Sequence, residues 1–336
     1  MKDTRNSNFE ALRIIAKLMI TAYHYVVHGV SNMAMGGGNV LYISSLWGKA
    51  GVNIFCLLTG YMLVTKENVN YKRLVNVELQ FMFYTFLGLG VGLLLGKSVG
   101  IGSLLKTFMP VTFEHYWYMT AYVIVFLLSP YFNTLIKTFD KKTFERLLII
   151  FLIAWCIIPF FTLRENNGLF WSQLIWFVVM YFTGAYIRLM EPRFTKRFYI
   201  HILWISNVLL VLSVISIGWL SGYNERFAHY IVYFRWSNSP LIVMICVAMM
   251  RLAAMAKFRS VGWINFLASL VLGIYLFQEN IFFQEICWHD WFNNSIPSTV
   301  FQQIIHVITS VACVCVLGGL IEFLRIQLFK LLRLSK

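Results

Sequence analysis

Long apolar stretches separated by short polar segments make up almost the whole chain. A helix that crosses a bilayer needs about 20 mostly apolar residues, so the pattern predicts about ten membrane-spanning helices. The expected spans are 10–30, 46–65, 74–96, 117–137, 147–163, 169–189, 199–219, 239–256, 263–283 and 299–326. We therefore expect an all-α, polytopic membrane helix bundle, formed by one domain over residues 1–336.

The composition agrees with this pattern. Hydrophobic residues make up 59% of the chain and charged residues only 12%, whereas a soluble domain is about 25% charged. The net charge of +14 does not indicate a nucleic-acid partner, because the basic residues are spread over short segments between the spans. The partner that this composition predicts is the lipid bilayer.

The basic residues also predict the orientation. Cytoplasmic loops carry an excess of Lys and Arg. With the N-terminus inside, most Lys and Arg residues fall in inside segments, and those outside are Lys49, Lys97, Lys106, Arg164, Arg226 and Arg235. We expect both termini to be cytoplasmic, and we expect the first apolar run to be retained as a membrane helix rather than cleaved as a signal peptide.

Ionisable residues inside spans mark functional sites by default, and the first span holds the densest set: Glu10, Arg13, Lys17, His24 and His28. At about 100° per residue, Arg13 and His24 share one helix face about 16 Å apart. These residues form a polar stripe along the helix. The stripe suits a long anionic donor whose reactive group lies at its far end, as in a coenzyme A thioester. Arg binds phosphate through its fork of donors, and His transfers protons near neutral pH. The alternative is that Arg13 is a cytoplasmic flank and His24 a packing residue.

Four motifs follow one another along the chain. They are RIIAKLMITAYH at 13–24, GVNIFCLLTGY at 51–61, HYWY at 115–118 with a following run that ends in Leu-Ser-Pro at 130, and LGIYLFQEN at 272–280. In this order they resemble the signatures of the integral-membrane acyltransferase 3 family, and the resemblance covers nearly the whole chain.

The resemblance implies a ten-helix core that takes an acyl group, usually acetyl, from cytoplasmic acyl-CoA. It implies that the acceptor is a hydroxyl of an envelope saccharide or a lipid-linked sugar. By the same resemblance, His24 is the general base or a transient acyl carrier, and Arg13 helps to hold the donor. Acetyl-CoA or another acyl-CoA is then a co-substrate, and no bound cofactor is expected.

The chain departs from the family pattern at three positions. Arg73 fits the first arginine of a pair after the second span, but Asn76 stands at the second position. Gln278 replaces a late-helix histidine, and Thr59 replaces a serine while keeping a hydroxyl group. The sequence therefore leaves open whether the donor is contacted at Asn76 and whether a proton relay runs through Gln278.

Other polar and aromatic residues complete the expected site. We expect donor binding by Arg13, Lys17, Lys72 and Arg73, and support from Asn53, Glu78, His115, Trp117 and Tyr275. Glu78 is a candidate to orient His24 or to pair with Arg13. The alternatives are a structural ion pair for Glu78 and a purely topological role for Lys72 and Arg73.

The cysteines predict neither a metal site nor a disulfide framework. All except Cys287 lie in apolar runs without ligand spacing, where they behave as small apolar residues. They are Cys56, Cys156, Cys246, Cys287, Cys313 and Cys315. We expect no catalytic thiol and no metal.

The sequence thus predicts an O-acetyltransferase of bacterial envelope or exopolysaccharide glycans, spanning the inner (cytoplasmic) membrane. Two rival interpretations stay open. The aromatic outer segments 221–230 and 287–294 also suit an exporter or polymerase of polysaccharide or lipid-linked oligosaccharide without acyl transfer, or a simple interfacial aromatic belt. Gln278 keeps open a catalytically inactive relative.

Overall fold

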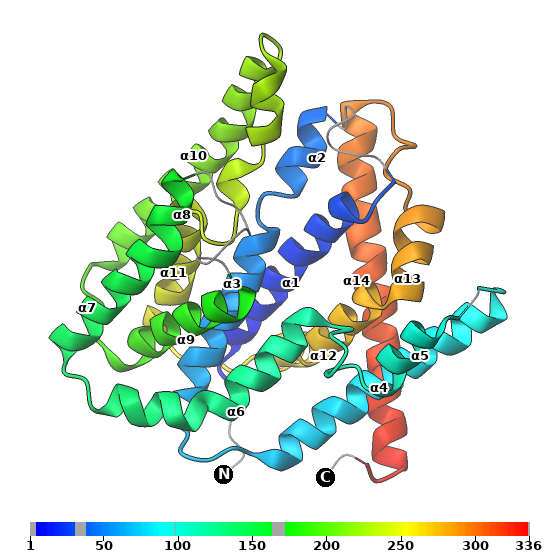
Figure 1. The fold of residues 1–336 in the computed structure, drawn as a ribbon, viewed down its shortest axis with the longest axis horizontal. Coiled ribbons are helices and arrows are strands. Elements are labelled where there is room, and N and C mark those ends of the chain that lie inside the picture. Colours follow the sequence, from blue (N-terminus) through cyan, green and yellow to red (C-terminus); the bar gives the residue numbers. More distant parts are fainter. Residues whose placement is uncertain (1–4, 31–37, 98, 163–171, 335–336) are drawn as a thin grey trace.

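The computed structural model describes residues 5–30, 38–97, 99–162 and 172–334. Every regular element in these ranges is a helix, as the hydropathy pattern predicted (Figure 1). The expected span 147–163 ends, and the expected span 169–189 begins, within residues 163–171. These two ends and Arg164 therefore lie outside the described ranges.

In the described part of the chain, nine long helices form the bundle. They are α1 (Ser7–Val27), α3 (Gly48–Leu63), α4 (Tyr71–Leu94), α6 (Trp117–Lys137), α9 (Gln173–Leu189), α10 (Lys196–Ser221), α11 (Pro240–Met255), α12 (Gly262–Glu279) and α14 (Val300–Leu331). A tenth, broken element consists of α7 (Lys141–Leu152), a π-helical stretch (Ile153–Ile157) and α8 (Ile158–Phe161). Shorter elements are α2 (Gly38–Ser44), α5 (Ile101–Phe108), η3 (Glu225–Tyr230), η4 (Tyr233–Arg235), α13 (Ile281–Glu285) and η5 (Ile286–Trp291).

Each expected span overlaps one of these elements, but the number ten is not established. Within the described residues, seven helices are long and apolar enough to cross a membrane, or up to eight if the bent pair α12 and α13–η5 counts as one span. The helix α9 is a shorter apolar helix. The helix α1 is not among the seven, and it carries the charged stripe.

Side chains at the helix ends explain where several helices begin. Asn6 and Asn70 accept hydrogen bonds from backbone N–H groups in the first turns of α1 and α4. Thr299 and Gln302 form a reciprocal capping box at the start of α14, which satisfies two backbone donors that a helix start leaves free.

The central helices α1 and α3 approach their neighbours closely at glycines. A Cβ atom on Gly60 of α3 would lie 2.0 Å from the carbonyl oxygen of Tyr181 on α9, and one on Gly184 of α9 would lie 2.1 Å from that of Leu57 on α3. Small residues allow such backbone contact between membrane helices. The helix α1 packs against α3, α11, α12 and α14, so its polar stripe is enclosed by the bundle.

A sharp break follows α12. The axis turns by 76° between α12 and α13–η5, and Asn280 stands at the turn. Its side-chain oxygen accepts from the N–H of Phe282 at 3.1 Å, and its nitrogen donates to the carbonyl of Tyr84 on α4 at 3.1 Å. Asn280 thereby caps the new helix and ties the turn to α4.

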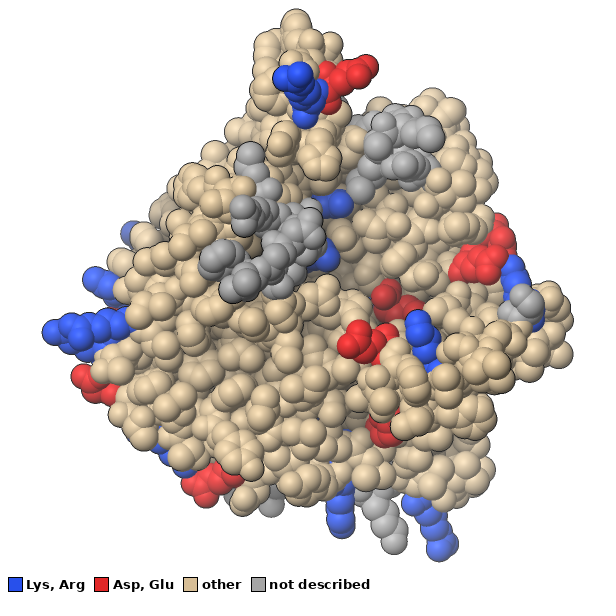
Figure 2. All heavy atoms as spheres, viewed as in Figure 1, with Lys and Arg blue, Asp and Glu red and all other residues tan. Residues whose placement is uncertain are grey.

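The bundle has two distinct ends. We call the end at which α1 begins and α14 ends the proximal end, and the end at which α1 ends and α3 begins the distal end (Figure 1). Figure 2 shows basic side chains projecting from the proximal edge of this face, and both basic and acidic side chains at its sides, near its centre and at its distal end.

Candidate active site

The polar stripe of α1 begins at the proximal end with an ion pair. Nη1 of Arg13 lies 2.5 Å from Oε1 of Glu10, one turn earlier in the helix. The other carboxylate oxygen of Glu10 is buried without a hydrogen-bond partner in the described part of the chain. Lys17 follows and is 2% exposed, so the stripe continues into the bundle interior as the periodicity predicted.

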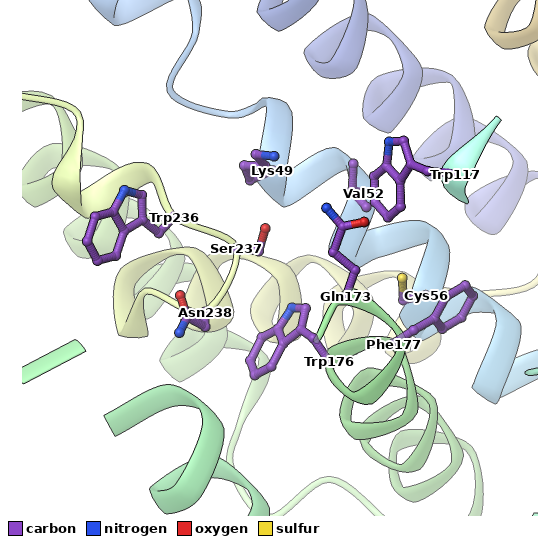
Figure 3. Close-up of a pocket in the computed structure, with 10 residues that line it drawn as sticks. All are labelled: Lys49, Val52, Cys56, Trp117, Gln173, Trp176, Phe177, Trp236, Ser237 and Asn238. Atoms are coloured by element: carbon purple, nitrogen blue, oxygen red, sulfur yellow. The ribbon is translucent and has the colours of Figure 1, made fainter. Parts of the chain in front are cut away.

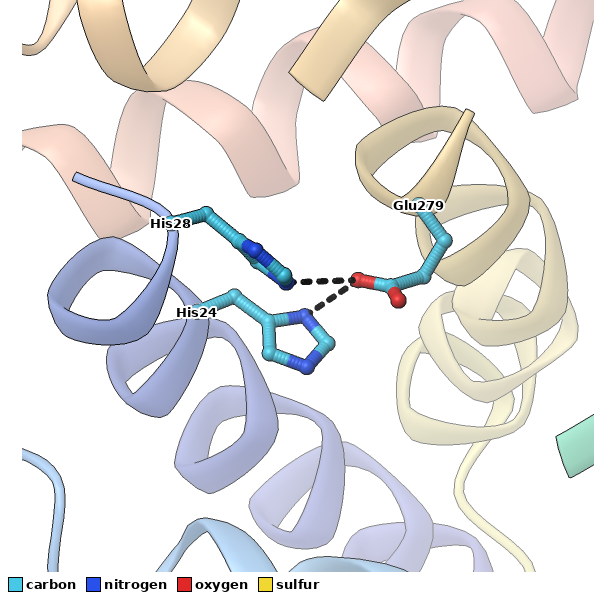
Figure 4. Close-up of side chains that lie close together, drawn as sticks. All are labelled: His24, His28 and Glu279. Atoms are coloured by element: carbon cyan, nitrogen blue, oxygen red, sulfur yellow. Dashed lines mark ion pairs between the residues drawn. The ribbon is translucent and has the colours of Figure 1, made fainter. Parts of the chain in front are cut away.

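At the distal end of the stripe, His24 meets an acidic residue from another helix. Oε1 of Glu279, the last residue of α12, lies 2.5 Å from Nδ1 of His24 and 3.9 Å from Nε2 of His28 (Figure 4). The two imidazole rings contact each other edge to face, 4.9 Å between centres. These three side chains are joined by two ion pairs across the α1–α12 interface.

Two side chains lie against Nδ1 of His24. The amide nitrogen of Gln278 is 2.5 Å away, and the amide oxygen accepts from the Thr21 hydroxyl at 2.9 Å. The second side chain is Glu279. A carboxylate only accepts and an amide nitrogen only donates, so the two contacts suit opposite protonation states of Nδ1.

A group of buried polar atoms without hydrogen-bond partners surrounds Glu279. Among the described residues they are Lys17 Nζ, Tyr275 OH, both ring nitrogens of His115 and Oε1 of Glu279 itself, whose contact with His24 is an ion pair rather than an aligned hydrogen bond. The Glu279 charge acts on Lys17, Tyr275 and His115. Buried polar groups are normally paired, so this cluster has the character of a site for a polar ligand.

Lys17 and Tyr275 form one wall of this cluster. The Lys17 ammonium lies 5.8 Å from the centre of the Tyr275 ring, and that ring packs against Tyr116 and Tyr118 at 6.1 Å. The Lys17 ammonium has no hydrogen-bond partner among the described residues, although the Glu279 charge acts on it.

His115 lies in the connection between α5 and α6, outside the spanning helices. Burial, followed by the nearby Lys106 charge, lowers the pKa of His115 to about 4, so the ring is neutral at physiological pH. Its ring lies 4.5 Å from the ring of Tyr116.

The expected donor residues separate into two groups. The charges of Arg73 and Arg13 both act on Tyr122 of α6, and the Arg73 guanidinium lies 5.6 Å from the Phe126 ring on the same helix. Arg13 and Arg73 both lie near the beginnings of their helices, α1 and α4. Lys72 is exposed and makes no ion pair with any described residue.

Asn53 has a structural contact set. Its side-chain oxygen accepts from the Trp176 indole at 2.9 Å, and its nitrogen donates to the carbonyl of Ser237 at 2.7 Å. Trp117, at the start of α6, lines a distal pocket beside these residues (Figure 3). Neither residue contacts His24 directly, so their support for the site is indirect.

Glu78 does not take the role considered for it. The structure pairs Arg13 with Glu10 and His24 with Glu279, and Glu78 of α4 makes no ion pair within the described ranges. Glu279 was not among the residues expected in the site, although its neighbour Gln278 was. The available signal was a carboxylate inside an apolar run, which is rare in a membrane helix unless it has a function.

The His24, His28 and Glu279 cluster also has the ligand types of a metal site. Their ligand atoms lie within 4.8 Å of one another, and two histidines four residues apart with one carboxylate is a known zinc-binding set. Lys17 places a positive charge beside the same carboxylate and opposes a resident cation. The expectation of no metal therefore stays a prediction.

That no thiol is catalytic also stays a prediction. All six cysteines are free. Cys315 of α14 comes nearest to the site, with Sγ 3.9 Å from Oγ1 of Thr21. Cys56 lines the distal pocket.

Comparison with known proteins assigns the chain to one group. A family model described as an acyltransferase domain matches residues 6–321. The match begins just before α1 and ends within α14, and it therefore includes the whole polar stripe and Glu279. Neither the curated proteins nor the solved structures contain a match.

Proposed function

The chain belongs to the acyltransferase 3 family, and from this premise we propose that it is a membrane O-acyltransferase. In the proposed reaction it moves an acyl group, acetyl in the first instance, from acyl-CoA to a hydroxyl. The acceptor is a saccharide of an envelope or exopolysaccharide glycan, or its lipid-linked precursor. The proposed location is a bacterial cytoplasmic membrane.

One observation carries the proposal. The Glu279 carboxylate lies 2.5 Å from the Nδ1 side of His24, and the buried Lys17 lies on the same face of α1 about two turns earlier. A base oriented by a carboxylate is the arrangement that activates a hydroxyl for acyl transfer. An adjacent buried cation stabilises the charge that forms on the carbonyl oxygen.

The proposed reaction uses these groups in sequence. Nε2 of His24 takes the proton of the acceptor hydroxyl while its oxygen bonds to the thioester carbonyl carbon. The carbonyl oxygen becomes an oxyanion that Lys17 stabilises, and Glu279 stabilises the imidazolium. When the carbon–sulfur bond breaks, the imidazolium returns its proton to the CoA thiolate, which leaves the acceptor ester, free CoA and the original His24.

The donor is proposed to enter at the proximal end. Arg13 and Arg73 lie there, near the beginnings of their helices, and offer guanidinium groups to the CoA phosphates. Arg13 and His24 lie about 16 Å apart along α1, and an extended pantetheine arm would run between them past Lys17. This placement requires the proximal end to be cytoplasmic.

The family match favours acyl transfer over the rival interpretation of a glycan exporter or polymerase. The inactive-relative interpretation rested on Gln278. That side chain lies against both Thr21 and His24, where it holds the histidine in place. The replacement of a histidine at this position therefore leaves a complete base and orienting pair.

The test is a transfer assay with the purified chain in detergent. With acetyl-labelled acetyl-CoA, the wild type should release CoA and pass label to a glycan acceptor or to water, and a deletion strain should lose one O-acetyl signal in its glycan NMR spectrum. His24→Ala should lose the transfer, whereas His201→Ala, which removes an exposed histidine on α10, should keep it. A folded wild type that neither transfers nor hydrolyses the label would contradict the proposal.

Sidedness has its own test. Reporter fusions at Lys141 and Lys257 should be cytoplasmic, and a fusion at Asn293 should be external. An external signal at Lys257 would reverse the proposed direction of acyl supply, because the donor end of the bundle would then face away from cytoplasmic acyl-CoA.

A further inference from the structure

The helices α1 and α12 run parallel from the proximal to the distal end, so positions along them can be compared. Near their beginnings, the Ser7 hydroxyl of α1 donates at 2.8 Å to a side chain in the first turn of α12. Near their ends, His24 meets Glu279. Tyr275 is one turn before Glu279 in α12, and Lys17 is about two turns before His24 in α1. Both side chains therefore start from the proximal side of the His24–Glu279 pair.

Lys17 and Tyr275 bring two buried hydrogen-bond donors to this level of the bundle. The Lys17 ammonium lies 5.8 Å from the centre of the Tyr275 ring. The charges of Glu279 and of the Cys315 thiol act on Lys17, but neither group lies within hydrogen-bond distance of its ammonium. The Tyr275 hydroxyl also forms no aligned hydrogen bond with the described residues. Buried donors are normally paired, so these two are available to an acceptor atom of a ligand.

The surroundings of Tyr275 fix its ring and favour its hydroxyl as a donor. The ring packs against the rings of Tyr116 and Tyr118, each at 6.1 Å between centres. The backbone N–H of Tyr118, at the start of α6, acts on the Tyr275 oxygen. A phenol has one proton to donate and lone pairs that accept. With an N–H on the side of its oxygen, the Tyr275 hydroxyl keeps its proton for another acceptor.

The position of these donors matches the route of the donor substrate. In the proposed function the acyl thioester comes from the proximal end and meets the acceptor hydroxyl at His24. Its carbonyl group then reaches His24 from the side on which Lys17 and Tyr275 lie. Along the α12 axis, Tyr275 is only about 6 Å before Glu279. A donor to the carbonyl oxygen has to lie close to the base and on the donor side of it, as Tyr275 does.

We propose that Tyr275 is a further catalytic residue, whose hydroxyl donates a hydrogen bond to the carbonyl oxygen of the acyl thioester beside the Lys17 ammonium. The inference rests on the proposed function, in which Lys17 alone stabilises this oxygen. The phenol keeps its proton throughout. The carbonyl oxygen becomes negative when the acceptor oxygen bonds to the carbonyl carbon, and it is a carbonyl again once the carbon–sulfur bond breaks. Hydrogen bonds that strengthen as this charge develops lower the barrier.

The first test removes the hydroxyl and keeps the ring. Tyr275→Phe should lower kcat for transfer from acetyl-CoA by roughly 10²–10³-fold, the usual effect of losing one oxyanion donor, and leave CoA affinity unchanged. The matched control is Tyr181→Phe on α9, which removes a buried hydroxyl that donates to Asn133 at 2.7 Å and should keep kcat. An unchanged kcat in folded Tyr275→Phe would overturn the proposal.

Thermal stability in detergent separates a catalytic hydroxyl from a structural one. Tyr275→Phe removes a buried polar group that has no aligned partner, so its Tm should stay the same or rise. Tyr181→Phe should lower Tm, because it leaves the Asn133 oxygen without its donor. A group that carries activity without adding stability is typical of a functional site. A fall in Tm for Tyr275→Phe as large as that for Tyr181→Phe would show a structural role and count against the proposal.

The second test reads the carbonyl directly, without turnover. His24→Ala should bind acetyl-CoA labelled with ¹³C at the carbonyl but not transfer its acyl group. The infrared stretch of the bound carbonyl should lie below that of a free acetyl thioester in an aprotic solvent, because the donors draw charge onto the oxygen. Adding Tyr275→Phe should raise this frequency. A band that does not respond would refute the assignment, and so would a band at the aprotic frequency in His24→Ala alone if the double variant does not fold.

The outcomes distinguish this inference from the proposed function. A wild type that transfers the acyl group, together with a Tyr275→Phe variant that keeps both kcat and the carbonyl band, would refute only the role of Tyr275. A folded wild type that does not bind acetyl-CoA would refute the proposed function, and this inference with it.

Discussion

Glu279 at the end of α12 places a carboxylate oxygen 2.5 Å from Nδ1 of His24 on α1. The two residues are far apart in the sequence, and neither element makes a site alone. In the proposed reaction this contact orients His24 as the base.

The first prediction concerns this pair. His24→Ala should lower transfer by roughly 10²–10⁴-fold, the usual contribution of general base catalysis, without loss of CoA binding. Glu279→Gln removes the charge that stabilises the imidazolium and should lower kcat by at least roughly 10-fold; a wrong histidine tautomer alone can cost as much as about 10⁴-fold. The measurement is steady-state transfer from acetyl-CoA. Glu285→Gln, at an exposed acid of α13 that pairs with Lys97, is the control, and equal losses in both glutamate variants would contradict the orienting role.

The second prediction concerns the donor end. Arg13→Ala should weaken CoA binding by roughly 1.5–3 kcal/mol, the value of one hydrogen bond to a charged group, and Arg73→Ala should do the same. Arg13→Lys should recover only part of this, because an ammonium loses the planar fork. Calorimetric titration with CoA measures the effect, with the exposed Lys72→Ala as the matched control. If His24→Ala lost CoA affinity while Arg13→Ala kept it, the donor would lie the other way along α1.

The third prediction concerns metals. Transfer should survive chelation by EDTA, because the proposed steps use only side chains and CoA. Added Zn²⁺ should inhibit the wild type, since His24, His28 and Glu279 offer three ligands within reach of one ion and a bound ion would occupy the base. His28→Ala should weaken this inhibition, as measured by the zinc concentration at half activity. Activity that disappears on chelation and returns with zinc would instead show a metal-dependent enzyme.

The fourth prediction concerns acid stability. The pKa of His115 is lowered to about 4 by burial, whereas an unfolded histidine titrates near 6.5. The unfolded state therefore binds the proton first, and the stability contributed by the neutral ring is present above about pH 6.5 and is lost as the pH falls towards 4. His115→Gln should flatten this part of the thermal stability profile in detergent, relative to the wild type. His201→Gln is the control, and identical profiles for His115→Gln and the wild type would contradict the prediction.

The periodicity of one helix was enough to predict half of the site. Arg13, Lys17 and His24 share a face because of the helical repeat alone, and the structure encloses that face between α3, α12 and α14. The partner of His24 could not be found in this way, because the register of α12 against α1 is set by tertiary packing. Glu78 and Glu279 are both acids in apolar runs, and only the packing distinguishes them.

The outer residues show the same limit. The sequence named His115 as a supporting residue, but its contact with the Tyr116 ring depends on how the connection between α5 and α6 folds. The cations Lys49 and Arg235 were recognised only as exceptions to the loop-charge bias. Their common contact with Tyr23 joins α3, η4 and α1, and no local pattern in the sequence predicts it.

The 76° break after Glu279 divides one stretch of chain into two independent parts. The helix α12 sets the position of the acid against α1, whereas α13 and η5 lie beyond the turn on the distal side. Asn280 fixes the turn through its own cap and through Tyr84, so changes in α13 and η5 need not move Glu279. In the proposed reaction, substitutions in α13 or η5 would therefore alter the distal side of the bundle while Glu279 and His24 stay in register.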